Sequence, residues 1–176
     1  MPAYRYAADQ FVATRWNEQK QNIGMLEFHI DPLGIPGGQE ILILSFKAGT
    51  IPGRKFGRGQ IEYLNGNIFY PTRPEPLGEM SVTFRDFIDS LTRLTIERWC
   101  RKVHDERTGF MGLTNSIKTT AHLVLFGPDG VSGLRTYLLR GVFPLGLPDI
   151  PLDHASGEQL TMEMSFSVDS IVGDRL

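Results

Sequence analysis

The chain has 176 residues, of which 41% are hydrophobic and 22% are charged, and its 18 basic and 20 acidic side chains give a formal charge of −2. This length predicts one domain over residues 1–176, with a core large enough to fold without a disulfide or a structural metal. The balanced charge argues against a surface that wraps nucleic acid. No segment approaches the ~20 apolar residues of a membrane-spanning helix.

Two strands are predicted in the first fifty residues. Apolar side chains alternate with Glu27 and His29 over residues 26–30, the period-2 pattern of a half-buried strand. Residues 41–46 are apolar on both faces, which predicts a strand covered on both sides. Residues 1–10 contain no apolar run, so we expect no signal peptide and synthesis in the cytoplasm.

Residues 47–60 combine glycines, a proline and basic side chains, which predicts a long exposed loop or an irregular hairpin. The basic cluster in it consists of Arg54, Lys55 and Arg58, with Phe56 between them. An acidic surface of another subunit is the favoured partner, and contacts to nucleic acid phosphates or to solvent alone are alternatives. Residues 65–67, Asn-Gly-Asn, predict a hairpin turn within residues 61–70.

Residues 80–84 alternate and predict another strand, and residues 86–103 predict the one clear helix. The expected apolar stripe of this helix is Phe87, Ile88, Leu91, Leu94, Ile96 and Trp99. Asp86 and Asp89 would lie in its first turn, where they complement the helix dipole. The charged residues 104–116 are expected to lie outside the core.

The C-terminal half predicts a hairpin and a long strand. Gly-Pro-Asp-Gly at residues 127–130 separates two strand-like runs, 119–126 and 134–143. Residues 159–168 alternate without error, so that Thr161, Glu163 and Ser165 share a polar face opposite an apolar one. The predicted fold is therefore mainly β, a sandwich or barrel of antiparallel strands with one flanking α-helix.

The sequence lacks the common catalytic and ligand-binding patterns, which favours a protein without enzymatic activity. The four histidines, including His104 and His154, lie far apart in the sequence, and no Cys-x-x-Cys or His-Glu-x-x-His pattern occurs, so we expect no metal site. Cys100 is interpreted as an ordinary helix thiol. No dinucleotide fingerprint, P-loop or nucleophile elbow is present. We therefore expect no cofactor.

Several features of the C-terminal part occur in a fixed order: Leu-Arg-Gly-Val-Phe-Pro at 139–144, Ile-Pro-Leu-Asp at 150–153, Ser-Gly-Glu at 156–158, and a strand that ends in Ser-Phe-Ser-Val-Asp at 165–169. This order resembles the C-terminal pattern of the tail tube proteins of contractile-tail bacteriophages. That pattern has a glycine-aromatic-proline corner, a Leu-Asp pair, a Ser-x-Glu turn and a long last strand. The resemblance covers residues 134–170, with weaker agreement around residues 83–87.

The resemblance implies a structural virion protein that forms hexameric rings, and rings that stack into a tail tube. The tube would be a conduit for DNA into the host, joined to sheath and baseplate proteins in the virion tail and assembled in the host cytoplasm. DNA would pass without sequence-specific contact. The loop of residues 47–60 would contact the next ring through Arg54, Lys55, Phe56 and Arg58. The polar face of Thr161, Glu163 and Ser165 would line the lumen or lie outward.

Three other interpretations remain open at this point. Two are close to the first: the tube subunit of a related bacterial contractile injection device, and a tail-tip protein that initiates the tube. The third is a flavin-binding split-barrel oxidoreductase, in which Arg54, Lys55 and Arg58 would hold the flavin phosphate.

Overall fold

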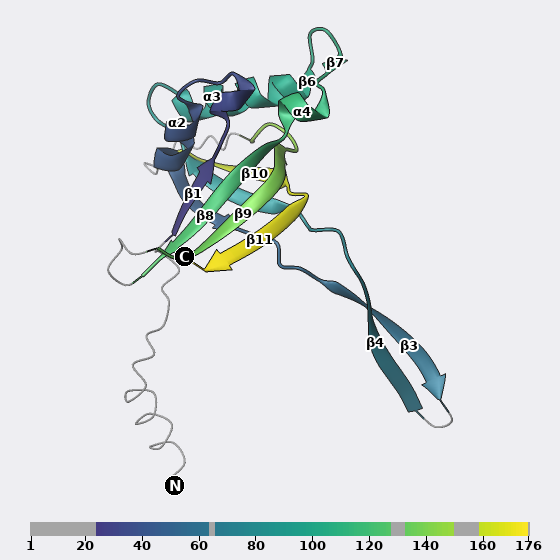
Figure 1. Cartoon of the computed structure of the whole chain (residues 1–176). Coiled ribbons are helices and arrows are strands. Elements are labelled where there is room, and N and C mark those ends of the chain that lie inside the picture. Colours follow the sequence, from purple (N-terminus) through teal and green to yellow (C-terminus); the bar gives the residue numbers. More distant parts are fainter. Residues whose placement is uncertain (1–23, 64–65, 128–132, 150–158, 176) are drawn as a thin grey trace.

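The computed structural model describes residues 24–63, 66–127, 133–149 and 159–175 (Figure 1). The strands are β1 (Gly24–Phe28), β2 (Phe46–Thr50), β3 (Phe56–Tyr63), β4 (Gly66–Pro74), β5 (Met80–Arg85), β6 (His104–Asp105), β7 (Phe110–Met111), β8 (Thr119–Phe126), β9 (Gly133–Pro144), β10 (Thr161–Ser167) and β11 (Ser170–Arg175). The helices are the short 3-10 helix η1 (Asp31–Leu33) and the α-helices α2 (Gly38–Ser45), α3 (Leu91–Val103) and α4 (Thr114–Ile117).

The main sheet has seven strands in the order β1-β8-β9-β10-β5-β2, with β11 also paired to β9. All of its pairings are antiparallel. Strand β9 belongs to two parts of the sheet: most of its length pairs with β8 and β11, and only its end, Phe143 and Pro144, pairs with β10. The mainly antiparallel β fold predicted from the sequence is therefore confirmed.

The change of partner along β9 occurs at a glycine bulge. The register passes from Thr119 opposite Val142 to Thr120 opposite Arg140, so Gly141 is an extra residue. Its φ of 69° is in the left-handed region that glycine adopts at little cost. The Asp169 amide donates to the Arg140 carbonyl oxygen at 3.0 Å, which fastens the start of β11 at the same point. The glycine-aromatic-proline motif of the sequence is thus the corner of the sheet.

The two parts of the sheet enclose an aromatic core. Phe28 of β1 lies with its ring centroid 5.1 Å from that of Phe166 of β10, and 6.2 Å from that of Phe84 of β5. Trp99 of α3 closes the cluster, at 5.9 Å from Phe28 and 5.6 Å from Phe166. The Trp99 indole donates to the carbonyl oxygen of Ile117 at 3.0 Å, so its one polar atom is satisfied. All four rings are fully buried.

The strand predicted at residues 41–46 is wrong, because residues 41–45 form most of α2 and Phe46 begins β2. The helix begins after Gly37, whose φ is 72°. Gly38 is packed so closely that a Cβ there would lie 2.9 Å from Ile35. Leu42 is buried whereas Leu44 is 66% exposed, so only one face of the run meets the core. A short apolar run has no periodicity that distinguishes a strand from a buried helix.

The predicted helix of residues 86–103 begins later than expected, at Leu91. Ser90 has a φ of 52°, which interrupts the helix, so Asp86 and Asp89 do not lie in its first turn. The buried face is Thr92, Thr95, Ile96 and Trp99, and the exposed apolar residues include Phe87, Ile88, Leu91 and Leu94. The predicted apolar stripe was therefore wrong in phase for most of its members. Thr92 and Thr95 lie on the buried face of the helix, where the sequence pattern placed Leu91 and Leu94.

The segment of residues 47–60 is mostly strand. Only residues 51–55 are irregular, between β2 and β3. The segment is neither one long loop nor a hairpin in itself, because β2 pairs with β5 and β3 pairs with β4. Strands β3 and β4 form a long two-stranded ribbon that projects from the body (Figure 1). Residues 104–116 do lie outside the core, as the small β6–β7 hairpin and α4.

Candidate assembly surfaces

The β3–β4 ribbon is an exposed element with little support from the rest of the molecule. Its register runs from Tyr63 opposite Gly66 to Phe56 opposite Pro74, so the turn lies where Asn-Gly-Asn predicted it. Gly59 allows the Tyr70 ring to cross the neighbouring strand, since a Cβ there would come within 2.7 Å of the ring. Arg58 stacks on Phe69, with its guanidinium carbon 3.5 Å from the ring centroid. These contacts stiffen the ribbon without burying it.

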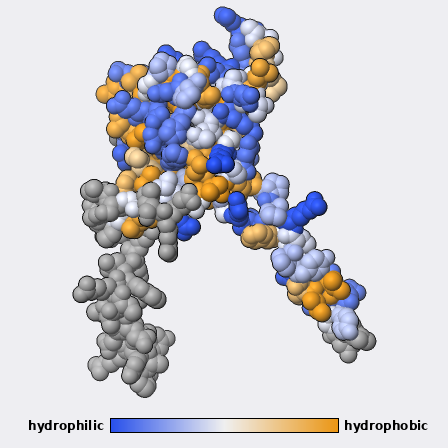
Figure 2. All heavy atoms as spheres, viewed as in Figure 1, coloured by the Kyte–Doolittle hydropathy of each residue, from blue (hydrophilic) through white to orange (hydrophobic). Residues whose placement is uncertain are grey.

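The ribbon carries apolar side chains that face solvent in the single chain (Figure 2). Its exposed large hydrophobic residues are Phe56, Ile61, Tyr63, Ile68, Phe69 and Tyr70. An isolated two-stranded hairpin is at best marginally stable in water, and a contiguous apolar patch on a soluble protein commonly marks an interaction site. The ribbon is therefore a candidate surface for contact with another chain, which would bury its apolar side chains.

The structure does not gather the predicted basic cluster into one site. Arg54 donates to the carbonyl oxygen of Ile171 in β11 at 3.1 Å, whereas Arg58 lies on Phe69 of the ribbon. The Lys55 carbonyl oxygen accepts from the amide of Glu75 at 3.0 Å, and Phe56 is 64% exposed. Two of the three cations are thus engaged with separate parts of the chain.

The second surface is the polar face of β10 and β5. Met162, Met164 and Phe166 are buried, and Thr161, Glu163 and Ser165 alternate with them on the other side, as the sequence predicts. In the register, Glu163 lies opposite Thr83 and Ser165 opposite Ser81. The Ser81 hydroxyl donates to a Glu163 carboxylate oxygen at 2.8 Å. This face is a hydrophilic sheet surface whose side chains partly satisfy one another.

The third surface consists of strand edges. Within the described ranges, β1 pairs only with β8, β2 only with β5, and β11 only with β9. The outer edge of each strand presents backbone N–H and C=O groups to which a further strand can pair. Closing a ring of copies is one way in which such edges are removed.

A fourth feature was not found by sequence reasoning. Phe87 and Ile88, just before α3, and Leu91 and Leu94, in its first turn, are exposed: Ile88 fully and the other three by 40–44%. The pattern assigned them to the core because they are apolar and nearly helical in spacing. Their exposure adds an apolar patch on a different element from the ribbon, which is a second candidate for contact between chains.

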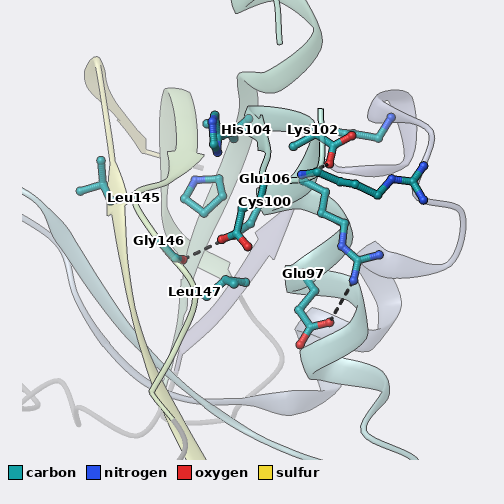
Figure 3. Close-up of a pocket in the computed structure, with 13 residues that line it drawn as sticks. Glu97, Cys100, Lys102, His104, Glu106, Leu145, Gly146 and Leu147 are labelled. Atoms are coloured by element: carbon teal, nitrogen blue, oxygen red, sulfur yellow. Dashed lines mark hydrogen bonds and ion pairs between the residues drawn. The ribbon is translucent and has the colours of Figure 1, made fainter. Parts of the chain in front are cut away.

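An open pocket of about 880 Å³ lies between the end of α3 and the residues after β9 (Figure 3). The Cys100 thiol in it donates to the Gly146 carbonyl oxygen at 3.4 Å. Burial, with a smaller contribution from the Glu97 carboxylate, raises the pKa of Cys100 to about 11. Glu97 is itself paired with Arg93 at 2.8 Å. A thiol with a raised pKa is a poor nucleophile, so this pocket lacks an activated cysteine. His104, at its rim, is exposed.

No protein family model matches the chain, and no curated protein matches it. Several solved structures are similar to the chain in fold. A chain of the anti-feeding prophage cap, the AFP tube-terminating cap, superimposes with a TM-score of 0.67 at 11% identity, over 92% of this chain and 93% of that one. A chain of the sheath-tube complex of the extracellular contractile injection system PVC, in its extended state, gives 0.66 at 12% identity, over 96% and 97%.

The chain has the fold of a contractile-tail tube protein. A chain of the AFP baseplate, with a TM-score of 0.65 and 13% identity over 91% of this chain, supports the same assignment. The resemblance noted in the sequence is therefore confirmed at the level of the fold. These superpositions cover 91–96% of this chain. No helix in the part of the chain that the structure describes is long and apolar enough to cross a membrane.

Proposed function

We propose that the protein is a non-enzymatic structural subunit of the tube, or of the tube terminator, of a contractile injection system. One observation carries this proposal: the fold of tube-system components extends over more than nine-tenths of both chains. The exposed edges β1, β2 and β11 and the apolar ribbon fit it, because each is a surface that a second copy would cover. Sheath and baseplate proteins would be its other partners.

In the proposed tube, six copies close a ring and rings stack. The main sheet would supply the ring wall, since its open edges allow pairing between neighbours without new secondary structure. The ribbon would reach the next ring. Arg54, Lys55, Phe56 and Arg58 lie at its base and along β3, so they would contribute at the start of that contact rather than at the tip.

The polar face of Thr161, Glu163 and Ser165 would line the lumen. It has no large apolar side chain that would have to be exposed to a water-filled bore. From Asp149 onward the sequence has six acidic residues and one basic residue, Arg175. Of these, Glu163 belongs to this face, and Arg85 lies on it opposite Thr161. A bore of nearly balanced charge would make few of the phosphate contacts that retard a moving nucleic acid. DNA passage from a bacteriophage tail into the host is the specific cargo role that we propose for it.

A second candidate is the tube or terminator of a related bacterial injection device. It is favoured because the solved structures reported above belong to the AFP and PVC systems. The two roles differ in cargo. Purified particles from the native source would contain this chain together with a DNA-filled head in the first case, and headless tail-like particles in the second.

Both candidate functions require that the chain assembles into rings. The experiment that tests this assembly is negative-stain electron microscopy of the purified chain across a concentration series. We expect six-fold rings, and hollow tubes at high concentration. A terminator would give rings without long tubes. A protein that stays monomeric at high concentration, by light scattering as well as by imaging, would overturn the proposal. Replacement of Arg54, Lys55 and Arg58 by Glu should preserve rings and prevent stacking, because it reverses the charge at the base of the ribbon.

A matched control reverses three exposed basic residues in the last turn of α3 and in the β6–β7 hairpin, which lie away from the ribbon (Figure 1) and at the other end of α3 from its exposed apolar residues: Arg101, Lys102 and Arg107. This control should retain the tubes of the wild type. Long tubes from the ribbon variant would remove the basic residues from the proposed contact, although the apolar ribbon residues would still be candidates.

A further inference from the structure

Two of the four histidines, His29 and His122, lie together although 93 positions separate them in the sequence. In the β1–β8 ladder Glu27 lies opposite His122, and the amide of His29 donates to the Thr120 carbonyl oxygen at 3.0 Å. His29 and His122 are therefore diagonal neighbours on adjacent strands, within reach of each other. Because Leu26 and Phe28 point into the core, Glu27 and His29 share the outer face of the sheet.

The distances between these side chains are those of a metal-ligand set. Nε2 of His29 is 3.3 Å from Nδ1 of His122, and one ligand atom from each of Glu27, His29 and His122 lies within 4.8 Å of the others. Two imidazole nitrogens bound to one tetrahedral Zn²⁺ at about 2.0–2.1 Å are separated by about 3.3 Å. The rings are nearly perpendicular, with an interplanar angle of 80°. All three residues are half-buried, so an ion can reach them from solvent.

A neighbouring side chain orients the carboxylate. The amide of Gln39, in α2, donates to Oε1 of Glu27 at 2.5 Å. The hydroxyl of Thr119 donates to the carbonyl oxygen of His29, which fixes the backbone where β1 ends. Partners of this kind hold ligands in place and commonly change metal affinity by about 10–100-fold when removed.

We propose that Glu27, His29 and His122 form a binding site for a divalent transition metal ion such as Zn²⁺. Two nitrogens and one carboxylate oxygen match the ligand preference of this ion and leave a fourth position for water. The bound ion would tie the edge strand β1 to β8 and, through Gln39, to α2. The site belongs to the folded subunit and would exist whether or not the protein forms tubes. The competing arrangement is a simple hydrogen bond between the two imidazoles, with one ring donating and the other accepting.

The test uses the full chain without an affinity tag, freed of metal with a chelator, in isothermal titration with ZnCl₂. We expect saturable binding of one ion per chain and a rise in melting temperature of about 5 °C or more at a hundredfold excess of Zn²⁺ over its Kd. His29→Asn, His122→Asn and Glu27→Gln should each weaken binding at least tenfold, and Gln39→Ala by about tenfold. His104→Asn, His154→Asn and Cys100→Ser are matched controls that should bind as the wild type does.

A second measurement needs no variant and remains informative if one of them fails to fold. Nitrogen chemical shifts of the histidine rings, recorded by NMR in the apo and Zn²⁺-loaded wild type, should change for His29 and His122 only. Absence of saturable binding, equal binding by the ligand variants, or ring shifts confined to His104 or His154 would each overturn the site. If Zn²⁺ did not bind saturably, the contact between His29 and His122 would be a simple hydrogen bond between the two imidazoles.

Discussion

Replacement of Gly141 by alanine tests the corner that joins the two parts of the sheet. Two separate costs are expected. A residue with a Cβ at a φ of 69° loses roughly 1–2 kcal/mol relative to glycine. In addition, the new Cβ would overlap the carboxylate of Asp169 and lie 2.8 Å from the Asp169 Cβ, so this residue would have to move.

Movement of Asp169 would also break its ion pair with Lys118, whose Nζ lies 2.7 Å from the carboxylate. This pair is partly exposed, with side-chain exposures of 29% for Lys118 and 51% for Asp169, so its loss costs about 0.2–1 kcal/mol. The costs together predict a destabilisation of about 2–3 kcal/mol. For a chain of this length, that corresponds to a fall in melting temperature of roughly 5–10 °C.

The chain offers two matched controls for this substitution. Gly109 has nearly the same φ, 68°, but no atom lies within 4 Å of a Cβ placed there, so Gly109→Ala should show the backbone cost alone. Gly146 also has open space and does not have a positive φ, so Gly146→Ala should change stability by no more than about 0.5 kcal/mol. The difference between Gly141→Ala and Gly109→Ala then measures the overlap with Asp169.

Thermal and urea unfolding followed by circular dichroism would provide these values, at a protein concentration low enough to keep the chain monomeric. The second change Asp169→Gly should recover most of the excess cost in Gly141→Ala, because it removes both the overlapping carboxylate and the Cβ. If Gly141→Ala were no more destabilising than Gly109→Ala, the close approach at the corner would be wrong. If both equalled Gly146→Ala, the left-handed backbone would be wrong as well.

Three further outcomes follow from single residues. Thr92→Val should stabilise the chain by about 1 kcal/mol in urea unfolding, because no described residue offers a hydrogen-bond partner to the buried Thr92 hydroxyl. A destabilised variant would show that this hydroxyl does have a hydrogen-bond partner. Phe69→Ser should leave the melting temperature of the monomer within about 2 °C but abolish long tubes, since the ring is 48% exposed; normal tubes would exclude it from the contact. Cys100 should react slowly with iodoacetamide at pH 8 and faster as the pH rises toward 11, because only the thiolate is nucleophilic and burial raises the pKa of Cys100 to about 11. A reaction rate equal to that of the unfolded chain would contradict the raised pKa.

The parts of the fold that depend on local chemistry could be predicted from the sequence. The alternation in β10 and the Asn-Gly-Asn turn of the ribbon each have a local physical cause, which is the two-residue period of a strand and a turn preference. The corner at Gly141 was expected only from the family resemblance, and its left-handed φ gives the physical reason for the glycine. These features are written within a few consecutive residues. The ordered motifs of residues 134–170 carried the resemblance that indicated the fold.

The parts that depend on distant contacts could not be predicted. Residues 41–45 belong to a helix that covers the core with one face only, and Gly38 at its start lies so close to α3 that a Cβ there would be 3.0 Å from the Thr95 side chain. The phase of α3 is set by the residues that fill the space around Trp99, and Thr92 and Thr95 fit there although leucines are nearby in the sequence. His29 and His122 are neighbours only because the β1–β8 register makes them so. Spacing along the chain carries no information about that register.

The error in the phase of α3 bears on function. A prediction from the hydrophobic pattern assigns apolar residues to the core of a single chain, on the assumption that the protein acts as a monomer. In this chain, Phe87, Ile88, Leu91 and Leu94 are exposed, as are six large apolar residues of the ribbon, Phe56, Ile61, Tyr63, Ile68, Phe69 and Tyr70. Leaving this many apolar side chains in water is unfavourable, and their cost is removed if copies of the chain bury them in contacts with one another. The residues for which the prediction from sequence was wrong in α3 are therefore candidates for the ring interface, as the ribbon residues are for the contact between rings.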